Sequence, residues 1–240
     1  MNSDHDFEGL LHVCAALSQS YSEGLIFIGG IAIYLHASHY EKTQKFAETT
    51  HDGDFMISLA DLGDMRSIEE ITQNRRIEKQ QLIKGGYEFD VYTEHQNGLP
   101  VAYAEAAAHS VSFSGFRVAC LEHLLVLKTA AFQDRGKSPK GAKDARDLIR
   151  LALLFKERPD PIDVSLVDPY WDEKELNLLR SLGRSPVIVD MVNKNSHEAR
   201  HIRAAIAELV ESFQPNFPSA LPSNDSPSKS GPSSGGRFRC

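Results

Sequence analysis

Three aspartates in the first half of the chain have the type and spacing of a metal site. Asp52 and Asp54 are separated by one residue in the stretch TTHDGDFMIS, and Asp90 lies in the stretch EFDVYT. Residues two apart on an extended chain point to the same face, so Asp52 and Asp54 would share one face of a strand. With Asp90 on a neighbouring strand, the three carboxylates would form an oxygen site suited to Mg²⁺ or Mn²⁺.

A pair of glycines precedes these carboxylates and follows a short apolar run. Gly29 and Gly30 come directly after LIFI at 25–28. Glycines at such a point let the backbone turn tightly and let phosphate oxygens approach the N–H groups at a helix start. His51 adjoins Asp52 and is therefore a further candidate for nucleotide contact. Two metal ions beside such a turn can clamp both the attacking oxygen and the leaving group of a phosphate.

The apolar periodicity predicts the elements that would position these residues. We expect strands at 25–28 and 54–58, hairpins over 76–94 and 109–119, and helices at 6–20, 31–37, 61–71, 121–134, 140–157 and within 172–212. This order indicates an α+β fold, with a mixed sheet flanked by helices and a helical C-terminal region.

Three regions follow from this pattern. Residues 1–118 form the mixed α/β half, and residues 119–213 form a helical half that completes a cleft. Over half of residues 214–240 are Pro, Ser or Gly, so we expect this tail to be disordered because it buries too little apolar surface.

Composition excludes several classes of protein. The 240 residues carry a formal net charge of −7, which disfavours a dedicated nucleic-acid binder. No apolar run approaches the roughly 18 residues that span a bilayer, and the N-terminus lacks the pattern of a signal peptide. The three cysteines are odd in number and far apart, which favours a reducing, cytoplasmic location.

The ordered set of motifs resembles the nucleotidyltransferase superfamily, which has the polymerase-β-like fold. That family shows a strand, Gly-Gly or Gly-Ser, a helix, Asp-x-Asp and a third Asp on a later strand. The stretch LEHLLVLKTAAFQDRGKSPKGAKDARDLIRL is similar to a segment of small bacterial nucleotidyltransferase-like proteins of the abortive-infection and toxin type. The residues that match it are Lys128, Lys143, Asp144 and Asp147. The resemblance covers roughly residues 22–155.

The resemblance implies a reaction and a role for each residue. A nucleoside monophosphate would pass from an NTP to an acceptor hydroxyl on RNA or tRNA, a protein or a small molecule, and a cognate antitoxin is a possible partner. Asp52, Asp54 and Asp90 would hold Mg²⁺ or Mn²⁺, and Asp90 would activate the acceptor hydroxyl. The phosphates would meet Gly29, Gly30 and either Lys128 or Lys143.

Two departures from the family pattern favour an alternative, a non-catalytic nucleotide-binding or interaction module on the same fold. Gly53 stands where the family usually has an apolar residue, and SHYEKTQKFAE lengthens the gap between Gly30 and Asp52. Residues 134–150 also carry a basic stripe that could meet nucleotide or RNA phosphates; its members are Arg135, Lys137, Lys140, Lys143, Arg146 and Arg150.

Other interpretations of these residues stay open. DGD alone is commonly a turn, although Met56 at the third ligand position excludes a calcium loop. Lys128 could extend to the surface past an apolar helix face, and Lys143 with Asp147 has the spacing of a simple helix ion pair. His197-Glu198-Ala199-Arg200-His201 formally matches a zinc motif, H-E-x-x-H, but Arg200 puts a positive charge beside the intended metal, which favours an exposed helix face instead.

Overall fold

The computed structural model of the protein describes residues 3–74, 79–94, 98–136 and 138–213. The tail expected at 214–240, with Cys240, lies outside these residues, as does Lys137. The described strands are β1 (Leu25–Ile28), β2 (Asp52–Ile57), β3 (Ile71–Asn74), β4 (Lys79–Lys84), β5 (Tyr87–Thr93), β6 (Val111–Phe113) and β7 (Phe116–Val118). The described α-helices are α1 (Ser3–Ser20), α2 (Gly29–His39), α3 (Glu41–Gln44), α4 (Leu59–Ile68), α5 (Tyr103–Ala108), α6 (Leu121–Arg135), α7 (Pro139–Glu157), α8 (Glu173–Leu182), α9 (Val187–Met191) and α10 (Ser196–Phe213).

The described strands form one mixed sheet in the order β3-β4-β5-β2-β1-β7-β6. β1 pairs antiparallel with β2 and parallel with β7, and β2 pairs parallel with β5. The three remaining pairs, β3–β4, β4–β5 and β6–β7, are antiparallel. β2 therefore lies directly between the strand that leads into Gly29 and the strand that carries Asp90.

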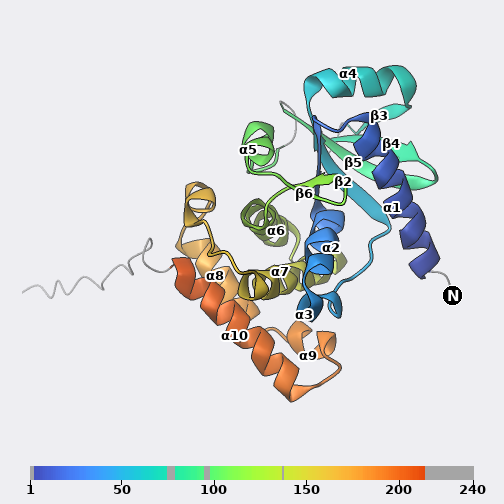
Figure 1. Cartoon of the computed structure of the whole chain (residues 1–240). Coiled ribbons are helices and arrows are strands. Elements are labelled where there is room, and N and C mark those ends of the chain that lie inside the picture. The colour runs from blue at the N-terminus through green and yellow to red at the C-terminus, as the bar shows by residue number, and fades with distance from the viewer. Residues whose placement is uncertain (1–2, 75–78, 95–97, 137, 214–240) are drawn as a thin grey trace, which may run out of the picture.

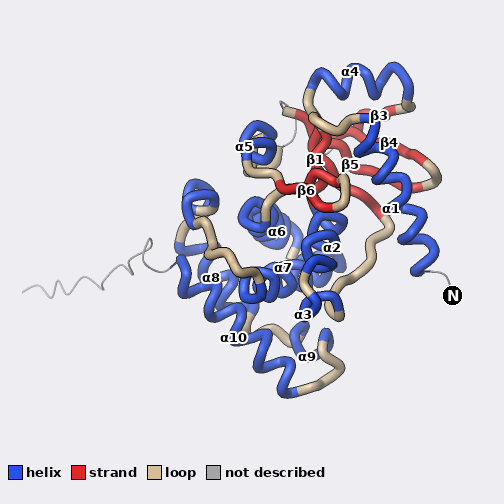
Figure 2. Tube along the Cα trace, viewed as in Figure 1, coloured by secondary structure: helices blue, strands red, loops and turns tan. Residues whose placement is uncertain are grey.

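Helices cover the two faces of the sheet. Figures 1 and 2 show α1 on one side of the strands and α5 and α6 on the other. On the α1 side the rings of Phe27, Phe55 and Phe89 follow one another across β1, β2 and β5, with centroids 6.2 and 6.0 Å apart. These buried rings form the centre of the core on that face.

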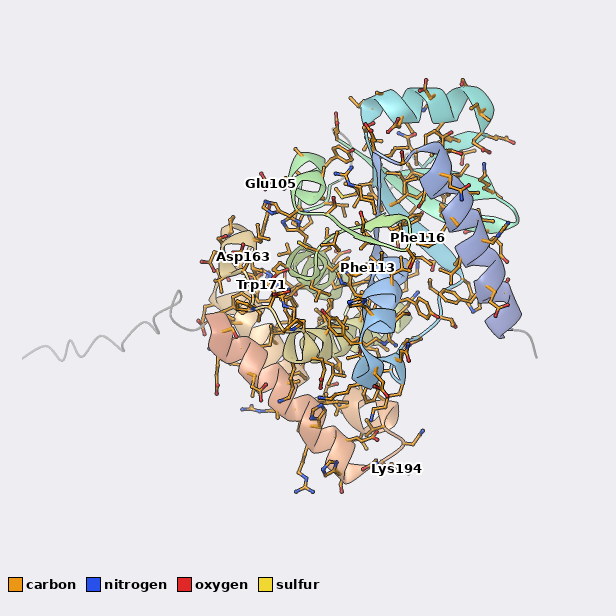
Figure 3. All side chains as sticks on the ribbon, viewed as in Figure 1. Glu105, Phe113, Phe116, Asp163, Trp171 and Lys194 are labelled. Carbon is orange, nitrogen blue, oxygen red and sulfur yellow. The ribbon has the colours of Figure 1, made fainter. Side chains whose placement is uncertain are left out.

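The β6–β7 hairpin extends this core toward α2. Phe116 packs against Phe27, and Phe113 packs edge-on to His36 of α2 at 4.9 Å; both phenylalanines are labelled in Figure 3. His36 is buried, and its Nε2 lies 2.9 Å from the carbonyl oxygen of Ala119. Burial lowers the pKa of His36 to about 4. The neutral ring therefore joins α2 to the chain just before α6.

The C-terminal helices form a second layer beyond α6 and α7 (Figure 1). Leu148, Ile149 and Leu151 of α7 are completely buried, and α10 presents Ile202 and Leu209 to the same core. Figure 3 labels Trp171, whose ring lies 5.0 Å from that of Phe213 at the end of α10.

The α+β fold class predicted from the sequence is confirmed. The predicted helices at 121–134 and 140–157 match α6 and α7 closely. The helix expected at 61–71 lies earlier in the chain, at Leu59–Ile68, because Ser58 caps its start and the chain enters β3 at Ile71. β3, α3 and α5 were not predicted. The division at residue 118 stays a prediction.

None of the described helices combines the length and apolarity that a membrane crossing requires. Cys14 and Cys120 are free and buried, and burial raises the pKa of their thiols to about 12 and about 11. These two side chains therefore behave as small apolar groups.

Candidate functional site

The Gly29-Gly30 turn lies directly against the predicted carboxylates. Gly29 has a φ of +66°, which favours glycine, and a Cβ placed there would overlap the carboxylate of Asp54. A Cβ on Gly30 would lie 3.3 Å from the Cβ of Thr50. The turn between β1 and α2 therefore meets β2 at the position where the sequence predicts a metal ligand.

The strand register brings two of the three aspartates together. Asp54 of β2 is the direct partner of Asp90 of β5, and Asp52 is the partner of Glu88. Paired residues of adjacent strands point to the same face, so these four acidic side chains form two rows. Asp54 and Asp90 are half-buried, and Asp52 and Glu88 are exposed.

Tyr92 extends this face one step further along β5. Burial raises the pKa of its hydroxyl, and the negative charges of Asp54 and Asp90 add to that effect. A phenol in this setting stays protonated and can donate a hydrogen bond. Tyr92 was not predicted as a site residue, although its spacing of two from Asp90 places it on the same face.

Asp52 is bound by two neighbouring side chains. The Thr50 hydroxyl donates to its Oδ1 at 2.6 Å, and the Lys143 Nζ lies 3.5 Å from the same oxygen. Burial alone would raise the pKa of Asp52, but the Thr50 hydrogen bond and the Lys143 charge outweigh it and lower the pKa. The Asp52 side chain is 57% exposed, so its contact with Lys143 is solvated.

A surface cavity of about 510 Å³ opens beside Asp52. Its lining includes Glu48, Thr50, Glu88 and Lys143. His51 also lines it, but the Nδ1 atom of His51 lies 2.9 Å from the carboxylate of Asp6 on α1. His51 is therefore engaged with α1, whereas Lys143 faces the carboxylate that the sequence predicts as a ligand.

Gly53 has a packing role that the sequence did not reveal. A Cβ at this position would overlap the ring of Phe89, its partner on β5. The aromatic ring occupies the space above the glycine on the α1 face of the sheet. The departure from the family pattern at Gly53 therefore reflects how the two carboxylate strands pack together.

Lys128 is part of a buried ion-pair cluster. Its Nζ lies 2.7 Å from Asp147 and 3.7 Å from Asp144, and its side chain is 10% exposed. Burial would lower the pKa of Lys128, but the charges of Asp147 and Asp54 raise it. The ammonium group therefore stays charged near Asp54, with α7 carboxylates as its direct partners.

The basic stripe of residues 134–150 is largely paired within the chain. Arg135 binds Asp144 through two hydrogen bonds of 2.7 and 3.1 Å. Arg146 binds Glu48 in the same two-bonded manner, at 2.8 and 3.0 Å. The guanidinium of Arg150 reaches Asp147 at 2.6 Å. These arginines therefore position elements of the protein, a use that their spacing alone did not indicate.

The fit of a divalent cation depends on the donor atoms and on their arrangement. The donor chemistry fits, because Asp52, Asp54 and Asp90 supply carboxylate oxygens on one face of adjacent strands. In the part of the chain that the structure describes, no three His, Cys, Asp or Glu side chains are gathered closely enough to hold a metal ion. At this edge, Asp52 is in contact with Thr50 and Lys143.

The H-E-x-x-H helix lies elsewhere, at the start of α10. His197 and His201 are exposed, and the Glu198 carboxylate accepts from Lys45 at 3.3 Å. Among the described residues, no three His, Cys, Asp or Glu side chains are gathered around this helix closely enough to hold a metal ion. This stretch is therefore an exposed helix face with ion pairs.

Comparison with solved structures identifies the fold. The protein JHP933 from Helicobacter pylori aligns with a TM-score of 0.52 at 12% identity, covering 90% of this chain and 96% of that one. A candidate nucleotidyltransferase from H. pylori aligns with a TM-score of 0.51 at 13% identity, covering 89% of this chain and 99% of the other. No protein-family model and no curated protein matches the sequence. The chain thus shares the fold of these structures, one of which is named as a nucleotidyltransferase.

Proposed function

We propose that the protein is a metal-dependent nucleotidyltransferase that moves a nucleoside monophosphate from an NTP to an acceptor hydroxyl. The observation that carries this proposal is the pairing of Asp54 with Asp90 directly against the Gly29 turn. The similarity of the fold to that of an H. pylori structure named as a nucleotidyltransferase supports this use of the pair.

In the proposed reaction the acceptor oxygen bonds to the α-phosphorus while the bond to the β-phosphate oxygen breaks and pyrophosphate leaves. A bound Mg²⁺ or Mn²⁺ would supply charge neutralisation for the triphosphate and lower the pKa of the hydroxyl. Asp52, Asp54 and Asp90 would hold the ion, and the Asp90 carboxylate would also take the hydroxyl proton. The Gly29 and Gly30 backbone would support the phosphates.

The two lysines would have unequal roles. Lys143, which is 37% exposed beside the cavity, is placed to bind triphosphate oxygens once they enter. Lys128 would contribute its buried positive charge next to Asp54 without leaving its ion pairs. His51 would lie at the rim of the cavity.

The test is transfer of label from each of the four NTPs, with Mg²⁺ or Mn²⁺, to RNA, tRNA, proteins and small hydroxylated acceptors. We expect Asp90→Asn to reduce transfer by at least about 100-fold, because a positioned proton acceptor contributes about that much. Asp64→Asn on α4 is the matched control, because Asp64 is exposed and lies outside the acidic rows. Transfer that survives in Asp54→Asn and Asp90→Asn would refute the assignment.

A non-catalytic nucleotide-binding module on the same fold is the second candidate. Among the residues that the structure describes, no three carboxylates are gathered closely enough to hold a metal ion, and Asp52 already contacts Thr50 and Lys143; both observations favour this candidate. This candidate requires NTP binding without label transfer to any acceptor class. In a cell, a role as a toxin would be tested by growth arrest on expression and its relief by a neighbouring gene product.

A further inference from the structure

One edge of α7 contacts the segment that leads into β2. Arg150 Nε donates to the Phe46 carbonyl oxygen at 2.6 Å, and both Arg146 and Arg150 bind the Glu48 carboxylate. Lys143 Nζ donates to the Thr50 hydroxyl at 3.1 Å. We call this set of contacts the α7 clamp; it consists of Lys143, Arg146 and Arg150 on α7 with Phe46, Glu48 and Thr50 before β2.

The contacts between α7 and residues 46–50 repeat at regular intervals along both chains. Lys143, Arg146 and Arg150 are three and four residues apart, which places them along one edge of a helix. Four helical residues rise about 6 Å, and two residues of an extended chain span about 6.6 Å. Every second residue of the segment therefore meets the next turn of α7, with the two chains running in opposite directions.

The clamp is anchored in the buried charge cluster. Arg150 is only 7% exposed, and its guanidinium is held by Asp147, whose carboxylate also binds Lys128. The two-bonded contact between Arg146 and Glu48 has the geometry of the stronger type of ion pair. Glu48 therefore connects a fixed point inside the helical half to the segment before β2.

The clamp ends at the carboxylate of the proposed site. Thr50 receives the Lys143 hydrogen bond and donates to Asp52, which is the first residue of β2. Thr50 also contacts the Gly29-Gly30 turn through Gly30. Displacement of the segment at Glu48 would consequently move Thr50 and Asp52 relative to Asp54 and the turn.

We propose that Glu48 is a positioning residue, which with Arg146 and Arg150 holds the segment 46–52 on α7 and so sets the place of Asp52 beside Asp54. The inference rests on the proposed function of that site. The insertion SHYEKTQKFAE, which departs from the family pattern, ends at Glu48. The proposal therefore assigns a structural role to the end of that insertion. The basic edge of α7 then serves this internal contact and leaves few cations for a polynucleotide.

The experiment compares Glu48→Gln with Glu173→Gln. The control removes the charge of a different exposed glutamate, which binds Arg180 at 2.5 Å on α8. Three quantities are measured on the full chain: hydrogen exchange of the amides of 46–54, the dissociation constant of Mn²⁺ alone, and the transfer rate. The first two need no catalytic turnover.

We expect Glu48→Gln to speed exchange in 46–52 by about 10-fold and to weaken Mn²⁺ binding by about 10-fold, because loss of a residue that orients ligands typically costs about 10- to 100-fold. The kcat should fall by a similar factor while the KM for NTP changes less than about twofold. Glu173→Gln should match the wild type in all three measurements.

Two results separate this inference from the proposed function. Unchanged exchange and unchanged Mn²⁺ affinity in Glu48→Gln would overturn the positioning role, even where global stability drops. Faster exchange and weaker Mn²⁺ binding in a protein that transfers no label would support the clamp and refute the transferase.

Discussion

Two groups of charged side chains around α7 differ in how much water reaches them. In the α6–α7 cluster, the side chains of Lys128, Asp147 and Arg150 are 10%, 1% and 7% exposed. At the sheet edge, Lys143 and Asp52 are 37% and 57% exposed. The buried groups are fixed by several partners, whereas the exposed pair can exchange its contact for solvent or a ligand. The difference separates charges that hold the structure from charges that are available for chemistry.

Removal of one buried charge should have the largest effect on the free energy of unfolding. Lys128→Met keeps much of the side-chain volume but leaves Asp147 and Asp144 without their ammonium partner. We expect the free energy of unfolding to fall by about 3 kcal/mol, the lower end of the cost of breaking a buried ion pair, because Arg150 and Arg135 still compensate part of the charge. Guanidinium unfolding followed by circular dichroism measures it.

The matched variant for that measurement is Lys143→Met on the exposed side. Loss of the Lys143 charge should change the free energy of unfolding by less than about 1 kcal/mol, since solvated ion pairs contribute little. Equal losses in the two variants would show that burial does not distinguish the two groups of charges.

A smaller effect should come from the packing beneath the exposed carboxylates. Gly53→Ala puts a methyl group into the ring of Phe89, and we expect a loss of about 1–3 kcal/mol from overpacking. Gly63→Ala on α4 is the control, because no atom lies within 4 Å of its added Cβ. That variant should be neutral or up to about 1 kcal/mol more stable, since alanine favours helices.

The measurement for Gly53→Ala is again the unfolding free energy, with Phe89→Leu added as a second substitution. The smaller leucine side chain leaves room for the added methyl group, so the two changes should be less than additive. Strict additivity would mean that Gly53 is not there to admit Phe89. Gly53 would then again favour the non-catalytic module.

Local patterns were sufficient to predict most of the fold. LIFI, the Gly85-Gly86 turn and the apolar spacing of α6 and α7 each depend on residues close in sequence. β3 was missed because four residues after α4 carry no clear alternation. α5 was missed because an alanine-rich stretch shows little amphipathic contrast.

The candidate site was predictable only in part. The spacing of Asp52, Asp54 and Asp90 indicated adjacent strands, and the register pairs Asp54 with Asp90. The orientation of Asp52 depends on Thr50 and Lys143, which no local pattern links. Glu48 escaped notice for the same reason, because its partners follow 98 and 102 residues later.

That separation has a consequence for the order in which the molecule assembles. Closing a loop of this length costs more chain entropy than forming the β4–β5 hairpin, so distant contacts form later. We expect the amides of 46–52 to gain protection after those of β4 and β5 during refolding, as pulse-labelled hydrogen exchange would record. Simultaneous protection would contradict this order. The edge that holds Asp52 is then the last part of the sheet region to mature, and a chain still emerging from the ribosome would be without it until α7 is made.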